Sequence, residues 1–346
     1  MKYAPIYIPT LNRYEHFYRL MESLKRNSWA CYTDVIVAVD YPPSEKYRDG
    51  WQKICNYLDK SDFSIFNNFI VFKRDVNYGI PKNINELWYY VQSHYDRWIY
   101  SEDDLKYSPN YLEYMDKCLD KYENDPDVIA VTGYSYPIDW KVSEGATYMR
   151  QNFNVASWGL GMWKSRQAEF NSYILTGQML KDAPSVIKSE KYKVMIDSTF
   201  QEYFRDTLKY DKNKSIECRV TDCSLTAFLA CYNKYCISPV ISKVRNWGFD
   251  GTGVCCPKSS GANTMVDDLD YAAQETDTAT SFELVLNDDG FLDENRRLLN
   301  KFDLVPSEKM AIAELNFKLI KRYGMKLGYV IRMAIAVINR IKRKFN

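Results

Sequence analysis

Short apolar runs alternate with amphipathic stretches through the first 135 residues of the chain. The apolar runs predict strands at Ala4–Ile8, Asp34–Val39, Asn68–Phe72, Trp98–Tyr100 and Val128–Val131. The stretches between them predict helices at Tyr14–Lys25, Ser44–Leu58, Ile84–Ser93 and Tyr111–Tyr122. This alternation is typical of an α/β fold with a mostly parallel central sheet, because each parallel connection needs a crossover segment. We therefore expect a ligand at the carboxyl ends of the strands.

Polar residues follow the expected strands at that edge of the sheet. They are Pro9-Thr10-Leu11-Asn12-Arg13, Asp40, Arg74 to Ile80, and Ser101-Glu102-Asp103-Asp104. The chain has no G-x-G-x-x-G after its first strand and no G-x-x-x-x-G-K-[ST] segment, which disfavours a dinucleotide-binding protein and a P-loop NTPase. A phosphate group would have to be bound by other means.

Glu102, Asp103 and Asp104 place three carboxylates directly after an apolar strand. Their repulsion is costly unless water or a cation compensates it, and hard divalent ions prefer oxygen ligands. A Mg²⁺ or Mn²⁺ ion bridged to a diphosphate would meet both requirements. The alternative is a solvated acidic turn before the Pro109 helix, because runs of charge are usually exposed. The position after the fourth strand favours the metal site.

The segment from Ser101 to Met115 resembles the metal-binding region of GT-A glycosyltransferases, above all that of N-acetylglucosaminyltransferase I. Both have an acidic triplet, a leucine, a short spacer, a proline and an aromatic-rich helix in the same order. Further segments resemble bacterial inverting GT-A enzymes in the expected order: Pro9 to Arg13, Asn77-Tyr78-Gly79-Ile80 with Asn83 and Asn85, Trp158-Gly159-Leu160-Gly161-Met162-Trp163, and Pro239 to Gly253. The resemblance spans residues 3–253.

This resemblance implies a GT-A fold and an inverting, metal-dependent transfer of a sugar from a nucleotide diphosphate sugar, with a UDP-sugar as the expected donor. It assigns the metal to Asp104 and places Glu102 and Asp103 near the sugar and ribose of the donor. The residues implied to bind the nucleotide are Pro9, Thr10, Arg13, Asp40, Asn77, Gly79 and Asn83. Those implied to belong to the loop that closes over the donor are Asn246, Asp250, Gly251 and Gly253.

Inverting members of the family also need a carboxylate that accepts the proton of the acceptor hydroxyl. Asp222, before a helical segment and the strand Ile237-Ser238-Pro239, matches that place, so we expect it to be the base. A role as a helix cap is equally open, and Asp250 and Asp139 are the fallback candidates. The resemblance places Trp158, Gly159 and Trp163 on the acceptor side, with core packing as the alternative for the tryptophans. His16 and His94 are assigned to surface or cap roles.

The charge of the chain is divided unevenly along its length. Nine of its 46 basic residues and none of its 45 acidic residues lie in 318–346, which leaves a net charge of −8 for residues 1–317. An acidic body argues against nucleic acid as a partner. Nine cysteines without a C-x-x-C pair, and a start without an apolar run, favour a reducing cytoplasm. A zinc site at Cys218, Cys223, Cys231 and Cys236 is a minor alternative.

The basic tail also has an apolar face. Val330, Ile331, Ala334, Ile335, Ile338 and Ile341 repeat at helical spacing among the basic residues. The stretch is too short and too interrupted by Arg332 to span a bilayer, but it suits a helix lying on an anionic membrane surface. Docking on the protein itself or on a dimer partner is the alternative.

We therefore expect four parts: residues 1–135 bind the nucleotide sugar, 136–256 bind the acceptor and carry the base, 257–317 form a loop and helical extension, and 318–346 associate with a membrane. The expected function is extension of a bacterial surface polysaccharide, on a glycan or lipid-linked acceptor, at the cytoplasmic face of the inner membrane. The alternatives are a sugar nucleotidyltransferase and a non-catalytic membrane-bound sugar-binding module. Nucleotide diphosphate release would distinguish the transferase from both.

Overall fold

The computed structural model describes residues 1–152, 155–175, 178, 179, 182, 222–253, 276–287 and 295, and the positions 319, 322, 323, 327, 330, 331, 333–335, 337 and 338. The chain forms two compact units. The first comprises Met1–Glu169 with Tyr235–Phe302, and the second comprises Phe170–Lys234 with Asp303–Asn346.

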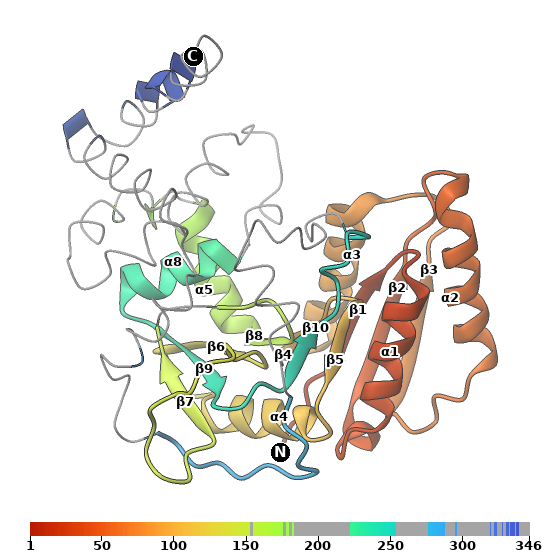
Figure 1. Ribbon diagram of the computed structural model, residues 1–346, viewed down its shortest axis with the longest axis horizontal. Coiled ribbons are helices and arrows are strands. Elements are labelled where there is room, and N and C mark those ends of the chain that lie inside the picture. The colour runs from red at the N-terminus through yellow and green to blue at the C-terminus, as the bar shows by residue number, and fades with distance from the viewer. Residues whose placement is uncertain are drawn as a thin grey trace. The chain divides into compact units, whose positions relative to one another are not determined.

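A central eight-stranded sheet with the order β3-β2-β1-β4-β8-β6-β9-β7 organises the first unit (Figure 1). Its strands are β1 (Ile6–Thr10), β2 (Asp34–Val39), β3 (Asn68–Lys73), β4 (Arg97–Tyr100), β6 (Val128–Thr132), β7 (Tyr148–Gln151), β8 (Leu160–Trp163) and β9 (Tyr235–Pro239). Six of the eight share one direction, whereas β7 and β8 run antiparallel to their neighbours. This sheet confirms the predicted α/β architecture with a mostly parallel central sheet.

The strand β1 lies between two parallel partners, which fixes where the candidate site is built. Ile6 lies opposite Val35 of β2 on one side and opposite Ile99 of β4 on the other. The carboxyl ends of the three strands consequently meet at one edge of the sheet. A second, two-stranded sheet pairs β5 (Leu105–Tyr107) with β10 (Val244–Asn246) in antiparallel register, and the two strands lie side by side in Figure 1.

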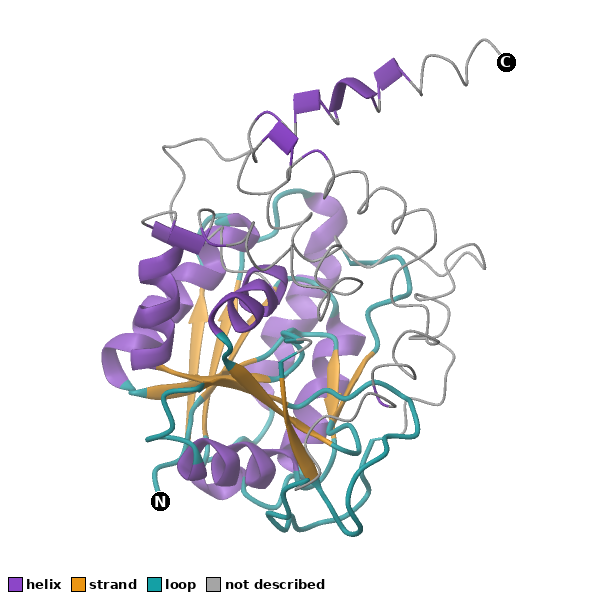
Figure 2. Cartoon of the chain, turned by 90° about the vertical axis from the view of Figure 1, so that its left-hand side faces the viewer, coloured by secondary structure: helices purple, strands orange, loops and turns teal. Residues whose placement is uncertain are grey.

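Helices cover both faces of the sheet, as Figure 2 shows. The helices α1 (Tyr14–Lys25), α2 (Arg48–Lys60) and α4 (Tyr111–Lys121) bury apolar side chains against one face, and α3 (Gly79–His94) covers the other. Side chains alternate along a strand, so Ile6 and Ile8 join the first core while Tyr7 joins the second with Leu87 and Val91. Both faces of the strands are therefore buried, as expected of a parallel sheet.

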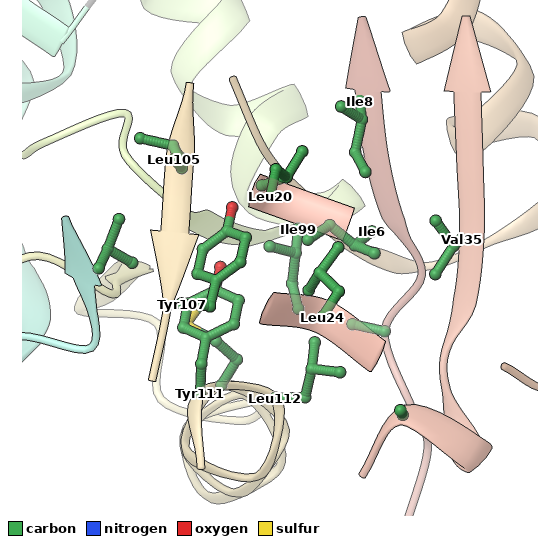
Figure 3. Packing of buried hydrophobic residues seen from close by; sticks show 14 of the residues in the cluster. Ile6, Ile8, Leu20, Leu24, Val35, Ile99, Leu105, Tyr107, Tyr111 and Leu112 are labelled. Atoms are coloured by element: carbon green, nitrogen blue, oxygen red, sulfur yellow. The ribbon is translucent and has the colours of Figure 1, made fainter. Parts of the chain in front are cut away.

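Two stacked tyrosines form a dense point of the larger core, shown in Figure 3. The rings of Tyr107 and Tyr111 lie parallel with centroids 4.0 Å apart. Gly159 packs against Tyr111 with φ at +67°, and a Cβ atom there would come within 2.6 Å of the tyrosine hydroxyl oxygen. Only glycine satisfies both the backbone conformation and the close approach.

Residues 276–287 return to the first unit and complete this core. Phe282 is buried with its ring centroid 5.0 Å from that of Tyr114, and Thr147 N donates to the Val285 carbonyl. Asn110 Nδ2 donates to Asp277 Oδ2, which also forms an ion pair with the buried Lys243. This segment is thus part of the core although the sequence separates it from the sheet.

The described part of the second unit includes α8 (Asp222–Tyr232) and the last residues of α5 (Lys164–Leu175). Phe170 packs edge-to-face on Phe228, and Tyr173 contacts Tyr232 with centroids 4.3 Å apart. Among the residues that the structure describes, no helix is long and apolar enough to cross a membrane. The predicted domain boundaries stay predictions.

The predicted elements are found near their expected positions, with shifts at the ends. β1 continues through Pro9 and Thr10, which were expected in a loop, and α2 begins at Arg48 after a short 3₁₀ turn at Glu45–Tyr47. α3 begins at Gly79, five residues before its predicted start. β5 was not predicted, because a three-residue strand directly after three acids carries no periodicity.

Candidate active site

The carboxyl ends of β1 and β4 bring four of the predicted residues into contact. The Thr10 hydroxyl donates a 2.9 Å hydrogen bond to Asp103 Oδ2. Arg13, at the N-cap position of α1, pairs with Asp103 Oδ1 through Nη2 and approaches Asp104 Oδ2 through Nη1 at 2.9 Å. One guanidinium therefore bridges two adjacent carboxylates, a geometry that suits the planar arginine fork.

Asp104 is the most enclosed member of the acidic triplet, with its side chain only 2% exposed. A Cβ atom on Gly248 would come within 2.0 Å of Asp104 Oδ2, so the backbone of that residue closes one side of the carboxylate. Trp247 N donates to the Asp104 carbonyl at 2.9 Å. Asp104 Oδ1 is buried and, within the described part of the chain, accepts no hydrogen bond.

The enclosure of Asp104 determines the electrostatics of the acid pair, Asp103 and Asp104. Burial, with the negative charge of Asp103, raises the pKa of Asp104, although Arg13 and His16 act in the opposite direction. Burial works against the charge on Arg13, but the two aspartates outweigh it and raise the pKa of the guanidinium. Arg13 is therefore charged, and its positive charge is shared by two carboxylates.

Glu102 lies beside this pair and is half-buried. Its Oε1 accepts a 3.2 Å hydrogen bond from the Ser157 hydroxyl, on the segment before β8. Its neighbour Ser101 is buried and accepts a 2.6 Å hydrogen bond from the Tyr107 hydroxyl. Glu102 thus has a partner of its own, whereas Asp103 and Asp104 share Arg13. The structure does not splay the three acids into solvent as an acidic turn.

Asp40 organises a second loop at the same edge of the sheet. Its carboxylate accepts hydrogen bonds from the backbone N–H groups of Tyr41, Tyr78 and Gly79 and from Asn77 Nδ2, at 2.8–3.2 Å. Gly79 has φ at +73°, which favours glycine where the chain turns into α3. Asp40 and Asn77 therefore hold the loop between β3 and α3 against the end of β2.

Asn83 is buried in the first turns of α3 and also serves this loop. Its Nδ2 donates to the Ala38 carbonyl at 3.2 Å, and its Oδ1 accepts from Arg74 Nε at 3.0 Å. Its side chain thus fixes Arg74 through one bond and β2 through another. Contact of these residues with a nucleotide stays a prediction.

The segment after β10 covers the acid pair. Asn246 Oδ1 accepts from Gly248 N at 2.6 Å, and Phe249 is buried in an aromatic cluster with Tyr134 and Trp158. Further along this segment, Asp250 contacts α1, where His16 Nε2 lies 2.9 Å from Asp250 Oδ2. Gly251 has φ at +85°, and Gly253 is half-buried at the end of the described segment.

The predicted acceptor-side residues mainly pack in the protein. Trp163 is 3% exposed and its indole N–H donates to the Leu119 carbonyl, so its ring is not available to stack on a sugar. Gly159 serves the close approach to Tyr111 described above. Trp158 is half-buried and packs on Tyr134 and Phe249, with centroids 4.7 and 5.8 Å away. For Trp163 the core-packing alternative is therefore the one that the structure supports.

Asp222, the expected base, is the first residue of α8 and is half-buried in the second unit. Its role stays a prediction. Of the fallback candidates, Asp139 is paired with Lys141 and its side chain is highly exposed, whereas Asp250 contacts His16. Cys218 and the side chain of Cys223 lie outside the described residues, so the zinc alternative stays untested there.

The site also contains residues that the sequence did not indicate. Trp247 contacts two guanidinium groups, with Arg245 Cζ 3.9 Å and Arg19 Cζ 4.5 Å from its ring centroid. Arg19 Nη1 lies 3.4 Å from His16 Nδ1 on the same helix. Arg13, His16 and Arg19 recur every third residue along α1, a spacing that places them on one face. From that spacing the shared face of these three residues could have been predicted.

The residues present fit a metal ion that is held jointly with a substrate. Among the described residues, no three His, Cys, Asp or Glu side chains are grouped to hold a metal ion. Mg²⁺-type sites, however, commonly use one or two carboxylates together with substrate phosphates. The unpartnered Oδ1 of Asp104 suits such a ligand role, because a buried carboxylate oxygen without a partner is costly.

No family model matches the sequence, and no curated protein matches it significantly. The chain is similar to several solved structures at low identity. S. aureus TarS 1-349 is 11% identical over 93% of this chain and 81% of that chain, with a TM-score of 0.38. The longer S. aureus TarS is 15% identical over 49% of this chain, which spans only 30% of that protein, with a TM-score of 0.33. Mannosyltransferase PcManGT from Pyrobaculum calidifontis, in complex with GDP-Man and Mn²⁺, is 11% identical over 66% and 73% of the two chains, with a TM-score of 0.36.

Proposed function

We propose that the chain is an inverting, metal-dependent glycosyltransferase that moves a sugar from a nucleotide diphosphate sugar to a glycan or lipid-linked acceptor. The observation that carries the proposal is the acid pair Asp103 and Asp104 at the joined carboxyl ends of β1 and β4, fixed by Thr10 and Arg13. Ligands of open α/β sheets bind at this edge.

The donor is proposed to lie across the two loops described above. The loop fixed by Asp40 and Asn77 would hold the nucleoside, with a UDP-sugar as the expected donor. Asp103 and Glu102 would orient the ribose and the sugar, since carboxylates accept hydrogen bonds from hydroxyl groups. The segment from Asn246 to Gly253 would cover the donor and exclude water.

Asp104 is the proposed protein ligand of a Mn²⁺ or Mg²⁺ ion. When bound, the ion would supply positive charge that stabilises the leaving diphosphate. The role of Asp104 is to hold that charge in place, and the role of Gly248 is to keep the carboxylate enclosed. Low solvent exposure strengthens electrostatic interactions at this position.

The proposed base is Asp222. It would accept the proton of the acceptor hydroxyl while the hydroxyl oxygen bonds to the anomeric carbon from the side opposite the diphosphate. The bond between the anomeric carbon and the diphosphate oxygen breaks in the same step, through an oxocarbenium-like state. Attack on the opposite face inverts the anomeric configuration.

The basic tail supports a proposed location at the cytoplasmic face of the inner membrane. Leu327, Val330, Met333, Val337 and Ile338 are exposed apolar residues on helical positions. Basic side chains interspersed with such residues suit an anionic membrane surface. A lipid-linked acceptor, as in bacterial surface polysaccharide synthesis, would then be reached without leaving the membrane.

The test is release of nucleotide diphosphate. The protein is incubated with UDP-, GDP- and dTDP-sugars, Mn²⁺ and a panel of glycan and lipid-linked acceptors. The released nucleotide and the anomeric configuration of the product are measured. We expect one donor to yield nucleotide diphosphate and a product of inverted configuration. Release of pyrophosphate in a parallel incubation with a nucleoside triphosphate and a sugar 1-phosphate would instead identify a nucleotidyltransferase. Sugar binding without turnover would identify a non-catalytic module.

A further inference from the structure

Arg13 contacts both carboxylates of the acid pair, one of which, Asp104, is the proposed metal ligand. Its guanidinium contacts Asp103 Oδ1 and Asp104 Oδ2, and these contacts connect the N-cap of α1 with the end of β4. Sequence resemblance assigned Arg13 only to the nucleotide pocket. However, the Arg13 guanidinium forms an ion pair with Asp104, so it competes with any other cation for that carboxylate.

We infer that Arg13 is the resident counter-cation of the acid pair and that a divalent metal ion binds Asp104 tightly only when Arg13 withdraws. The inference rests on the proposed function for the identity of the metal ligand. A guanidinium and a divalent ion carry like charges and repel each other strongly when both lie at one buried carboxylate. The two cations therefore exclude one another at this carboxylate.

Arg13 is the partner that can move. Its side chain is 18% exposed, whereas that of Asp104 is 2% exposed and is enclosed by the backbone of Gly248. The Arg13 side chain makes no capping hydrogen bond to α1, so its withdrawal leaves the start of the helix unchanged. Asp103 would keep its hydrogen bond from Thr10.

A donor diphosphate gives the withdrawn guanidinium a new partner, because arginine binds phosphate oxygens through two parallel hydrogen bonds. Metal binding and donor binding are consequently coupled through one side chain. In the free protein Arg13 offsets part of the negative charge of the acid pair and keeps the metal affinity low. With the donor present, the same residue leaves the carboxylate and pairs with the diphosphate.

The experiment measures Mn²⁺ binding to the full chain by electron paramagnetic resonance, without any sugar nucleotide. The variants are Arg13→Ala and, as the matched control, Arg19→Ala, which removes the same charge six positions along α1. Arg19 contacts Trp247 and His16 instead of the acids. We expect Arg13→Ala to bind Mn²⁺ at least about tenfold more tightly than the wild type, and Arg19→Ala to change the affinity less than about threefold.

Asp104→Asn in the Arg13→Ala background should abolish the gain, which assigns the ion to that carboxylate. Unchanged or weaker Mn²⁺ binding by Arg13→Ala would overturn the inference, as would an equal gain in Arg19→Ala. If Arg13→Ala does not fold, Arg13→Lys is decisive, because one ammonium group cannot replace the two contacts of the fork. It should bind Mn²⁺ more tightly than the wild type, and equal or weaker binding would overturn the inference.

Thermal unfolding gives a second readout. Removing Arg13 leaves two buried carboxylates without their counter-cation, so Arg13→Ala should melt at a lower temperature, and Mn²⁺ should recover part of the loss by binding the folded state. Stabilisation by Mn²⁺ that is the same in wild type and variant would overturn the inference. These measurements use no donor, so a failure to release nucleotide diphosphate would leave them unaffected.

Discussion

Thr10 and Asp103 are 93 positions apart in the sequence and are joined by a 2.9 Å hydrogen bond. The bond exists because β1 and β4 are parallel neighbours, so that residues after each strand meet at one edge. It links the first loop of the chain to the acidic triplet and leaves Arg13 to bridge Asp103 and Asp104.

Replacing Asp104 should remove metal-dependent donor binding. Asp104→Ala deletes the proposed ligand, so we expect the affinity for the donor identified by nucleotide release to become independent of Mn²⁺. Isothermal titration with and without Mn²⁺ measures this. Asp49→Ala is the control, since Asp49 is an exposed residue that pairs with Lys53 on α2. Wild-type Mn²⁺ dependence in Asp104→Ala would contradict the assignment.

Replacing the proposed base should separate binding from transfer. Asp222→Asn keeps the size of the side chain but removes its basicity, so we expect unchanged donor affinity and a loss of turnover of about 10²-fold or more. Asp250→Asn and Asp139→Asn are measured in parallel. If one of these loses turnover while Asp222→Asn keeps it, that residue is the base.

The loop held by Asp40 should depend strongly on its carboxylate. Asp40→Ala leaves the N–H groups of Tyr78 and Gly79 without their acceptor, and unsatisfied buried donors cost about 1–3 kcal/mol each. We expect the free energy of unfolding to fall by about 3 kcal/mol in urea denaturation. Asp40→Asn retains one acceptor oxygen and should lose about half as much. A loss below about 0.5 kcal/mol for Asp40→Ala would show that the loop is held otherwise.

Stability should fall as the pH rises through the titration range of Asp116. Burial raises the pKa of this carboxyl to about 7, despite the hydrogen bond from Ala4 N and the charge of Arg97. Asp120 adds to the rise. Because the folded state holds a proton that the unfolded state releases near pH 4, the free energy of unfolding decreases between about pH 4 and pH 7.

Asp116→Asn should flatten this dependence, because asparagine keeps an acceptor for Ala4 N and cannot ionise. Chemical denaturation at several pH values measures the effect, which amounts to about 4 kcal/mol at most for a shift of this size. Asp120→Asn, at an exposed neighbour, should retain most of the wild-type slope. Identical slopes in wild type and Asp116→Asn would show that Asp116 is ionised in the folded protein.

Deleting residues 318–346 should release the protein from anionic vesicles. The deletion removes nine basic residues, and each one near an anionic surface contributes about 1 kcal/mol. Sedimentation with anionic and with zwitterionic vesicles measures the difference. Replacing Arg340, Lys342, Arg343 and Lys344 by glutamine in the full chain should weaken binding to anionic vesicles alone. Sedimentation that is unchanged by the deletion would assign the tail to another role.

Periodicity predicted the first half of the sheet well. Asp34–Val39 and Tyr14–Lys25 have the expected bounds, because each is a continuous apolar or amphipathic run with polar residues at both ends. Because the carboxyl ends of parallel strands meet at one edge of a sheet, the sequence also predicted that Thr10, Asp40 and Asp103 lie at the same edge. These positions depend only on strand order and direction, which the alternation of elements carries.

The contacts within the site could not be predicted in the same way. The bridge from Arg13 to two aspartates depends on a side-chain rotamer, and the sequence offers many other acids to an arginine. Trp163 was expected beside an acceptor but is buried, because the same aromatic ring suits a core and a sugar face equally. The contact of His16 with Asp250 joins residues 234 positions apart, a separation at which local pattern carries no information.

Phe282 makes the core around α4 depend on a segment that is distant from it in the sequence. Its ring packs on Tyr114, and the neighbouring Asp277 is bound by Asn110 and Lys243. The N-terminal sheet and helices therefore do not form a complete core by themselves. A shortened chain of residues 1–253 would lack Phe282 and would expose this side of α4 to solvent. A stable first unit therefore needs residues 276–287 as well as the sheet.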